Sequence, residues 1–244
     1  MSLDHRAPHG RFVVPESGDL AVLVEPEQAR PRGLVLYLHG RSGDELSLFE
    51  DDRIALLDAL LGAGHLVAGP NMHGDQWGNR LAQSDIAALV RWVRRRHDVP
   101  TLFVIGESMG ANAAANLLRL GEIEVAATVL LAPSLSLPNV WKRGEEGRRS
   151  LTAAYGLALD GSDVLHRTAE WDAARHVPAN YPPIRVYASR ADRISAVDTV
   201  TAPWVEGLRR AGTDVDLIEV TGDHVSDDHI RPADVVAFFG RFLS

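Results

Sequence analysis

The chain has 244 residues, of which 45% are hydrophobic and 24% are charged. This composition is typical of a globular protein and excludes a disordered or fibrous chain. There is no cysteine, which excludes disulfides, a cysteine nucleophile and thiolate metal sites. With 25 Lys and Arg against 33 Asp and Glu, the net charge is −8, and this acidic balance argues against a nucleic-acid-binding protein.

The longest apolar runs, near 34–38 and 125–132, are much shorter than the roughly 20 residues that span a bilayer. Residues 1–6 carry no apolar stretch of the signal-peptide type. We therefore expect no membrane span, no nucleic-acid partner and, by default, a cytoplasmic location.

Short apolar runs typical of buried strands alternate along the chain with segments of helical periodicity. We expect strands at 20–25, 34–38, 65–69, 101–105, 126–132, 184–189 and 215–220. We expect helices at 46–61, 81–96, 109–120, 196–211 and from Pro232 onward. This alternation predicts an α/β fold with a mostly parallel central sheet flanked by helices, built as one domain over residues 1–244.

One stretch departs from the alternation. Residues 134–183, about fifty residues between two strands, are too many for a plain connection. They contain a cluster of charged residues and then an expected helix around 151–159. We interpret residues 134–183 as a small lid-like helical insertion within the domain.

The motif Gly106-Glu107-Ser108-Met109-Gly110 reads G-x-S-x-G and stands between an apolar strand and an alanine-rich helix. In that context the strand turns sharply into the helix, and the bracketing glycines let the two elements approach without a Cβ clash. The Ser108 hydroxyl is then presented at the carboxyl end of the sheet, where α/β proteins place their sites. The motif predicts that Ser108 is a nucleophile.

With this motif the chain resembles the α/β-hydrolase superfamily of serine esterases, lipases and thioesterases, from about residue 20 to its end. In that family the triad follows the order nucleophile, acid, histidine on successive strand ends. The resemblance implies that Asp192, in Ser-Arg-Ala-Asp, is the acid and that His224, in Thr-Gly-Asp-His, is the base. It implies no cofactor and no metal.

Other residues compete for these roles. Asp192 also fits a turn or helix-capping residue, and His229 stands five positions after His224. We prefer His224 because it follows the last strand directly, and we expect His229 to lie at the surface near two aspartates. Three further serines also lie near strand ends but lack the bracketing glycines: Ser42, Ser134 and Ser195.

In the family the turn after the third strand supplies an oxyanion donor, and here that turn is His39-Gly40-Arg41. The resemblance implies that the backbone N–H groups of Arg41 and Met109 stabilise the oxyanion. Glycine is not repeated in this turn as it is in lipases, so Ser42 or Gly43 is an alternative donor. We expect His39 to be structural, hydrogen-bonded beneath the loop.

The loop that follows the fourth strand contains Met72, His73, Asp75 and Trp77. Met72 and Trp77 are candidates to line an acyl pocket, and loop packing is the alternative. His73 is a candidate to support the pocket without contacting the substrate itself. With Asp75 it forms a His-x-Asp pair, but there is no third ligand at a sensible spacing and we expect no metal site.

These residues predict a serine hydrolase that cleaves carboxylic esters or thioesters of a small to medium acyl substrate through an acyl-enzyme on Ser108. The same triad serves a thioesterase, acyltransferase or cyclase, and it can be retained in a ligand-binding protein that does not catalyse. A prolyl-type peptidase fits less well, because the chain has no room for a large accessory domain. The acyl acceptor and the oligomeric state stay open.

Overall fold

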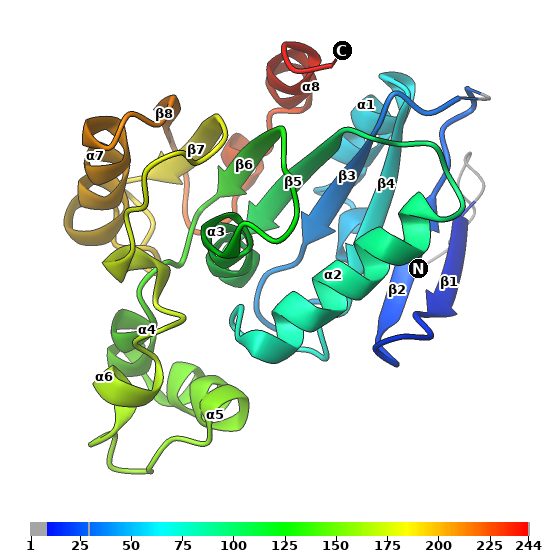
Figure 1. Ribbon diagram of the computed structural model, residues 1–244. Coiled ribbons are helices and arrows are strands. Elements are labelled where there is room, and N and C mark those ends of the chain that lie inside the picture. Colours follow the sequence, from blue (N-terminus) through cyan, green and yellow to red (C-terminus); the bar gives the residue numbers. More distant parts are fainter. Residues whose placement is uncertain (1–8, 29, 244) are drawn as a thin grey trace.

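The computed structural model describes residues 9–28 and 30–243, so residues 1–6, which were inspected for a signal peptide, lie outside the described residues. Eight strands form a single sheet in the order β1-β2-β4-β3-β5-β6-β7-β8 (Figure 1). The strands are β1 His9–Val13, β2 Leu20–Val24, β3 Gly33–Leu38, β4 His65–Pro70, β5 Leu102–Glu107, β6 Ala127–Leu131, β7 Ile184–Ser189 and β8 Val215–Val220.

The sheet is mostly parallel, as the alternation of strands and helices predicts. β2 pairs antiparallel with both β1 and β4. The five pairs that run from β4 through β3, β5, β6 and β7 to β8 are parallel. β1 was not expected from the sequence because it is an exposed edge strand without an apolar run. The parallel order brings the carboxyl ends of β3, β5, β7 and β8 to one edge, where the predicted site residues lie.

Most helices begin and end near their expected limits. The helices of the main layers are α1 Ile54–Gly62, α2 Arg80–Arg94, α3 Met109–Leu120, α7 Ala202–Arg210 and α8 Pro232–Gly240. Among the described residues no helix has both the length and the apolar character that crossing a bilayer requires.

Two expected helices are shorter than predicted. The segment 46–61 forms a 3₁₀ turn at Ser47–Phe49, and α1 begins only at Ile54, after Arg53. Arg53 is buried and its Nε donates to Glu107, so a long-range ion pair fixes where α1 starts. The segment 196–211 opens with a π-helical turn at Val197–Thr201 before α7.

The sheet carries a hydrophobic core on each face. On one face Ile86 and Leu89 of α2, the buried alanines of α3 and Trp204 of α7 belong to the same hydrophobic core. On the other face α1 and α8 pack side by side, and Phe239 of α8 stacks on Phe103 of β5 with ring centroids 4.5 Å apart. The strands in between are buried on both faces, which explains their continuous apolar runs.

Between β6 and β7 the chain forms three helices, α4 Leu137–Arg143, α5 Glu145–Tyr155 and α6 Val164–Arg167, and a 3₁₀ turn at Ala173–Arg175. Figure 1 shows these helices grouped together, away from α1 and α8. The expected helix at 151–159 is thus displaced toward the amino end. Two acidic residues favour the start of α5, and Gly156, at φ +62°, ends it in the left-handed conformation.

His65, at the start of β4, is a buried imidazole packed edge-on against Phe103. Burial lowers the pKa of His65 from 6.5 to about 4, so the folded protein resists protonation that the unfolded chain accepts. The stability that this neutral group contributes is present above pH 6.5 and is lost as the pH falls toward 4.

We expect His65→Phe, which keeps the aromatic contacts but cannot titrate, to flatten the pH dependence of stability. As the pH falls from 6.5 to 4, the free energy of unfolding should decrease less in His65→Phe than in the wild type. The difference between the two decreases should be up to about 3 kcal/mol. Urea unfolding at a series of pH values measures this. Identical pH dependence in the two proteins would contradict it.

Candidate active site

The turn from β5 into α3 places Ser108 in a backbone conformation that side-chain-bearing residues rarely adopt. Its φ is +48° and its ψ is −105°. A Cβ on Gly106 would lie 2.6 Å from Gly110 O, and one on Gly110 would lie 2.0 Å from Leu38 O. Both glycines are therefore required by the close approach of backbone segments, as the G-x-S-x-G motif predicts.

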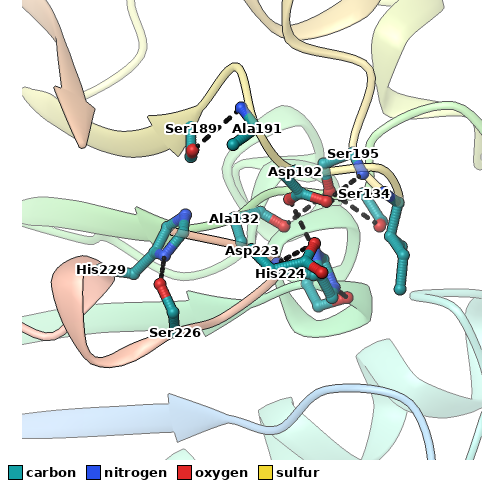
Figure 2. Close-up of polar contacts among 12 residues, drawn as sticks. Ala132, Ser134, Ser189, Ala191, Asp192, Ser195, Asp223, His224, Ser226 and His229 are labelled. Atoms are coloured by element: carbon teal, nitrogen blue, oxygen red, sulfur yellow. Dashed lines mark hydrogen bonds and ion pairs between the residues drawn. The ribbon is translucent and has the colours of Figure 1, made fainter. Parts of the chain in front are cut away.

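A continuous chain of hydrogen bonds starts at the Ser108 hydroxyl. Ser108 Oγ lies 2.8 Å from His224 Nε2, and His224 Nδ1 lies 2.7 Å from Asp192 Oδ2. Asp192 and His224 come from the loops after β7 and β8. These loops are held together because Ser189 Oγ donates to Gly222 O at 2.7 Å. The structure thus brings together the three residues that the sequence analysis selected (Figure 2 shows the Asp192–His224 contact).

Asp192 accepts hydrogen bonds within its own turn, after β7, and it also contacts the imidazole of His224. Its Oδ1 accepts hydrogen bonds from the backbone N–H groups of Ile194, at 2.7 Å, and Ser195, at 2.9 Å. Burial alone raises the pKa of Asp192, but the hydrogen bonds from His224 and Ser195 outweigh it, and the pKa lies below its ordinary value. The carboxylate is therefore ionised and available to an imidazolium on His224.

The competing residues lie elsewhere. His229 is buried, with Nδ1 3.3 Å from Ser226 Oγ, and burial lowers its pKa, so the expectation that it lies at the surface was wrong. Figure 2 shows His229 and Ser226 apart from the contact between Asp192 and His224. Ser134 and Ser195 are also buried, and their hydroxyls lie 3.3 Å from each other.

The turn after β3 contains the candidate oxyanion donors. Ser42 N donates to Asp75 Oδ1 at 2.7 Å and Gly43 N to Gly40 O at 3.1 Å, so both alternative oxyanion donors are occupied. The N–H of Arg41 has no acceptor within the part of the chain that the structure describes. Met109 is the first residue of α3, and its N–H lies ahead of the intrahelical hydrogen bonds.

His39 is buried under this turn, as expected for a structural residue. Its Nδ1 lies 2.7 Å from Gly40 O and its Nε2 lies 2.8 Å from Asn71 O. The imidazole therefore joins the turn after β3 to the loop after β4, and it has no contact with the Ser108 hydroxyl.

Glu107, the residue before the serine, takes part in a buried polar cluster that the sequence analysis missed. Its Oε2 accepts from Tyr37 OH at 2.5 Å and from Arg53 Nε at 2.9 Å. Burial, followed by the charge of Glu107, raises the pKa of Tyr37. Since a Cβ on Gly40 would lie 3.0 Å from Glu107 Oε1, this carboxylate also packs against the turn after β3.

A cavity of about 450 Å³ opens above Ser108. Trp77 lines it, whereas Met72 does not and is instead packed in the hydrophobic core. The Trp77 indole donates to Ser150 Oγ of α5 at 2.6 Å, and Ser150 Oγ donates to Asp75 Oδ2 at 3.0 Å. The loop after β4 is thus attached to α5. The remaining lining residues come mainly from α4, the start of α5 and the loops after β3, β7 and β8.

Three residues near this loop have the geometry to hold a cation: possible ligand atoms of Asp19, His73 and Asp85 lie within 4.8 Å of one another. They already bond among themselves, with His73 Nδ1 2.8 Å from Asp85 Oδ2 and Asp19 accepting the backbone N–H of His73 at 2.9 Å. The hydrogen bond to Asp85 raises the pKa of His73, and burial raises that of Asp85 to about 6. Asp75, the expected neighbour of His73, accepts from Ser42 and Ser150 instead.

Residues 33–183, more than half of the chain, match the family of the α/β hydrolase fold. The chain belongs to this family, as its sheet order and its strand–serine–helix turn indicate. In sequence it is similar to the lysophosphatidylserine lipase ABHD12 of Danio rerio, with 29% identity over 122 residues. That match covers 47% of this chain and 30% of the relative, so the chain spans less than a third of that protein's length.

Solved structures share the fold across the whole chain. An S-formylglutathione hydrolase, FrmB of Staphylococcus aureus, superposes with a TM-score of 0.71 at 14% identity and covers 98% of each chain. An esterase of the bacterial hormone-sensitive lipase family gives 0.69 at 22% identity, covering 100% of this chain and 86% of its own. A hyperthermophilic esterase from the archaeon Pyrobaculum calidifontis gives 0.71 at 16% identity, covering 97% and 84%.

We expect Gly110→Ala to destabilise the protein because its methyl group has no space beside Leu38 O. β3 and α3 must move apart to admit it, which we expect to cost at least about 3 kcal/mol. Thermal unfolding measures the loss. Gly62→Ala, at the open end of α1 with nothing within 4 Å, is the control and should keep or slightly raise the wild-type Tm. Equal Tm values for both variants would contradict the packing argument.

Proposed function

We propose that the protein is a serine hydrolase that cleaves carboxylic esters of small to medium acyl groups through an acyl-enzyme on Ser108. The observation that carries this proposal is the continuous hydrogen-bond chain from Ser108 Oγ through His224 to Asp192, with spacings of 2.8 and 2.7 Å. A serine hydroxyl is a poor nucleophile unless an adjacent base takes its proton as it attacks. The neighbouring imidazole meets that requirement.

In the proposed mechanism Ser108 Oγ attacks the ester carbonyl carbon while His224 Nε2 takes the hydroxyl proton. Asp192 holds the imidazole with its Nδ1–H toward the carboxylate and stabilises the imidazolium that forms. Collapse of the tetrahedral intermediate breaks the ester bond, and His224 gives the proton to the departing alcohol. A water molecule then attacks the acyl-enzyme by the same route and releases the acid.

The negative charge on the carbonyl oxygen needs donors that are in place before the reaction. We assign this role to the backbone N–H groups of Arg41 and Met109. The support is that the competing donors Ser42 and Gly43 are already hydrogen-bonded, while Arg41 N–H has no acceptor among the described residues. The start of α3 adds a favourable helix dipole at the same place.

We also propose that residues 134–183 serve as a cover for the acyl-binding cavity. Val140 of α4 and Glu145, Glu146 and Gly147 of α5 line that cavity. This segment is attached to the loop after β4 by the Trp77–Ser150 hydrogen bond and to the turn after β3 by the Arg41–Glu146 ion pair. The lipase, esterase and thioester-hydrolase names of the similar proteins support ester or thioester cleavage here.

We expect a fluorophosphonate probe to label the wild type on Ser108, and Ser108→Ala to lose both the label and the hydrolysis of 4-nitrophenyl esters. The reason is that the probe reacts only with a serine activated by a base. Ser134→Ala is the matched control, because this buried serine lines the same cavity without contacting His224, and it should keep the label. Equal labelling of Ser108→Ala and the wild type would contradict the proposal.

We expect Asp192→Asn to lower kcat on the order of 10⁴-fold, because an amide N–H beside His224 Nδ1 imposes the wrong tautomer. The amide oxygen can still accept from Ile194 and Ser195, so the Tm should stay near that of the wild type. Asp223→Asn, at the exposed acid that accepts the His224 backbone N–H, is the control and should lose much less activity. Similar losses of activity in the two variants would contradict the assignment of Asp192 as the acid of the triad.

A further inference from the structure

The charged residues that line the cavity divide into paired and unpaired groups. Three of them are acidic, and each is held by an arginine: Glu107 by Arg53, Glu146 by Arg41 and Glu145 by Arg149. Two other lining arginines, Arg143 and Arg193, have no carboxylate within ion-pair distance among the described residues. The cavity therefore presents two uncompensated positive charges, in a chain whose net charge is −8.

Arg143 is the last residue of α4, and it lines the cavity together with Ser108 and His224. Its one recorded hydrogen bond is long, 3.4 Å from Nε to Asn139 O, which leaves the fork of terminal N–H groups without a protein acceptor in the described chain. Arg143 is exposed, so an anion can bind these N–H groups without displacing a protein partner.

Arg193 lies on a different element, the loop after β7. It follows Asp192 directly after β7, and it lines the cavity together with Ile194. Its side chain is exposed and takes part in no ion pair in the described chain. Two arginines on separate elements, α4 and the β7–α7 loop, thus border one cavity, and guanidinium groups are well suited to binding carboxylates and phosphates through two parallel hydrogen bonds.

We propose that Arg143 and Arg193 bind an anionic oxygen group of the substrate, so that the preferred substrate is an ester carrying a carboxylate or a phosphate. This rests on the proposed function, because it assigns the substrate class of the same site. The anion sits beside the reacting ester without touching Ser108, and it takes no part in the bond changes. Arg41 is not included, since Glu146 already pairs with its guanidinium at 2.9 Å.

The test compares esters that differ only in charge. The mono-4-nitrophenyl ester of adipic acid is compared with 4-nitrophenyl hexanoate, which has the same acyl chain length. For the phosphate source, 1-hexanoylglycerol 3-phosphate is compared with 1-hexanoylglycerol. We expect kcat/KM for the charged member of at least one pair to exceed that of its neutral partner by about 10-fold or more. A preference for both neutral members would overturn the proposal.

The variants Arg143→Gln and Arg193→Gln show whether these side chains cause the preference. Each should lower kcat/KM for the charged ester about 10-fold more than for its neutral partner, chiefly through a higher KM. Arg148→Gln is the control, because Arg148 is an exposed arginine of α5 that does not line the cavity, and it should change neither. Equal losses on charged and neutral esters would mean that the arginines only support the structure, and would overturn the proposal.

A binding measurement separates this proposal from the hydrolase proposal. Calorimetry of Ser108→Ala with adipate and with glycerol 3-phosphate needs no turnover, and we expect one of the two to bind and Arg143→Gln in that background to weaken it. If wild type hydrolyses neutral esters but neither anion binds, this proposal alone fails. If no ester is turned over and Ser108 is not labelled, the hydrolase proposal fails, and anion binding then reports on the arginines independently.

Discussion

The turn between β5 and α3 admits no side chain at either bracketing glycine, and that steric constraint governs the rest of the site. Because Gly110 lies against Leu38 O, the start of α3 is pressed onto the end of β3. Ser108 is consequently held at positive φ, with its hydroxyl projecting toward the loops that carry His224 and Asp192. The same contact places the first N–H of α3 beside the turn that contains Arg41, so one feature of the backbone positions both the proposed nucleophile and the proposed oxyanion donors.

Polar groups around this turn are paired by hydrogen bonds that restrict the movement of the surrounding loops. Glu107 is held by Tyr37 and Arg53 below the turn, and His39 bridges the loops after β3 and β4. On the far side Asp192 is fixed by two backbone N–H groups before it contacts His224. A buried polar network that is fully satisfied in this way is rigid, which suits a site that has to be arranged before substrate arrives.

Much of the fold and the proposed triad was predictable because the informative signals are local. Short runs rich in apolar and β-branched residues indicated the strands from β2 to β8, and the motif around Ser108 stands between a predicted strand and a predicted helix. Asp192 and His224 were assigned from the resemblance to the family, and the parallel order of the strands lets both reach one edge of the sheet. The exposed strand β1 gave no such signal, since its five residues lack an apolar run.

The features that were not predictable depend on partners far apart in the sequence. Glu107 meets Tyr37 and Arg53 across separations of 70 and 54 residues, and His73 meets Asp19 rather than its near neighbour Asp75. The burial of His229 and the placement of Met72 in the core likewise follow from tertiary packing. The pairing of the arginines around the cavity depends on where α4 and α5 lie. No local pattern in the sequence predicted the limits of these two helices.

The covalent bond between the Ser108 oxygen and an acyl carbon is the step on which the proposed mechanism depends. It is tested most directly with a 4-nitrophenyl carbamate, because carbamoyl-enzymes break down slowly enough to be isolated. We predict release of one equivalent of nitrophenolate per active chain and a matching mass increase on the peptide that contains Ser108. Modification of another residue, or ester hydrolysis that continues undiminished with no carbamoylated protein, would contradict the account.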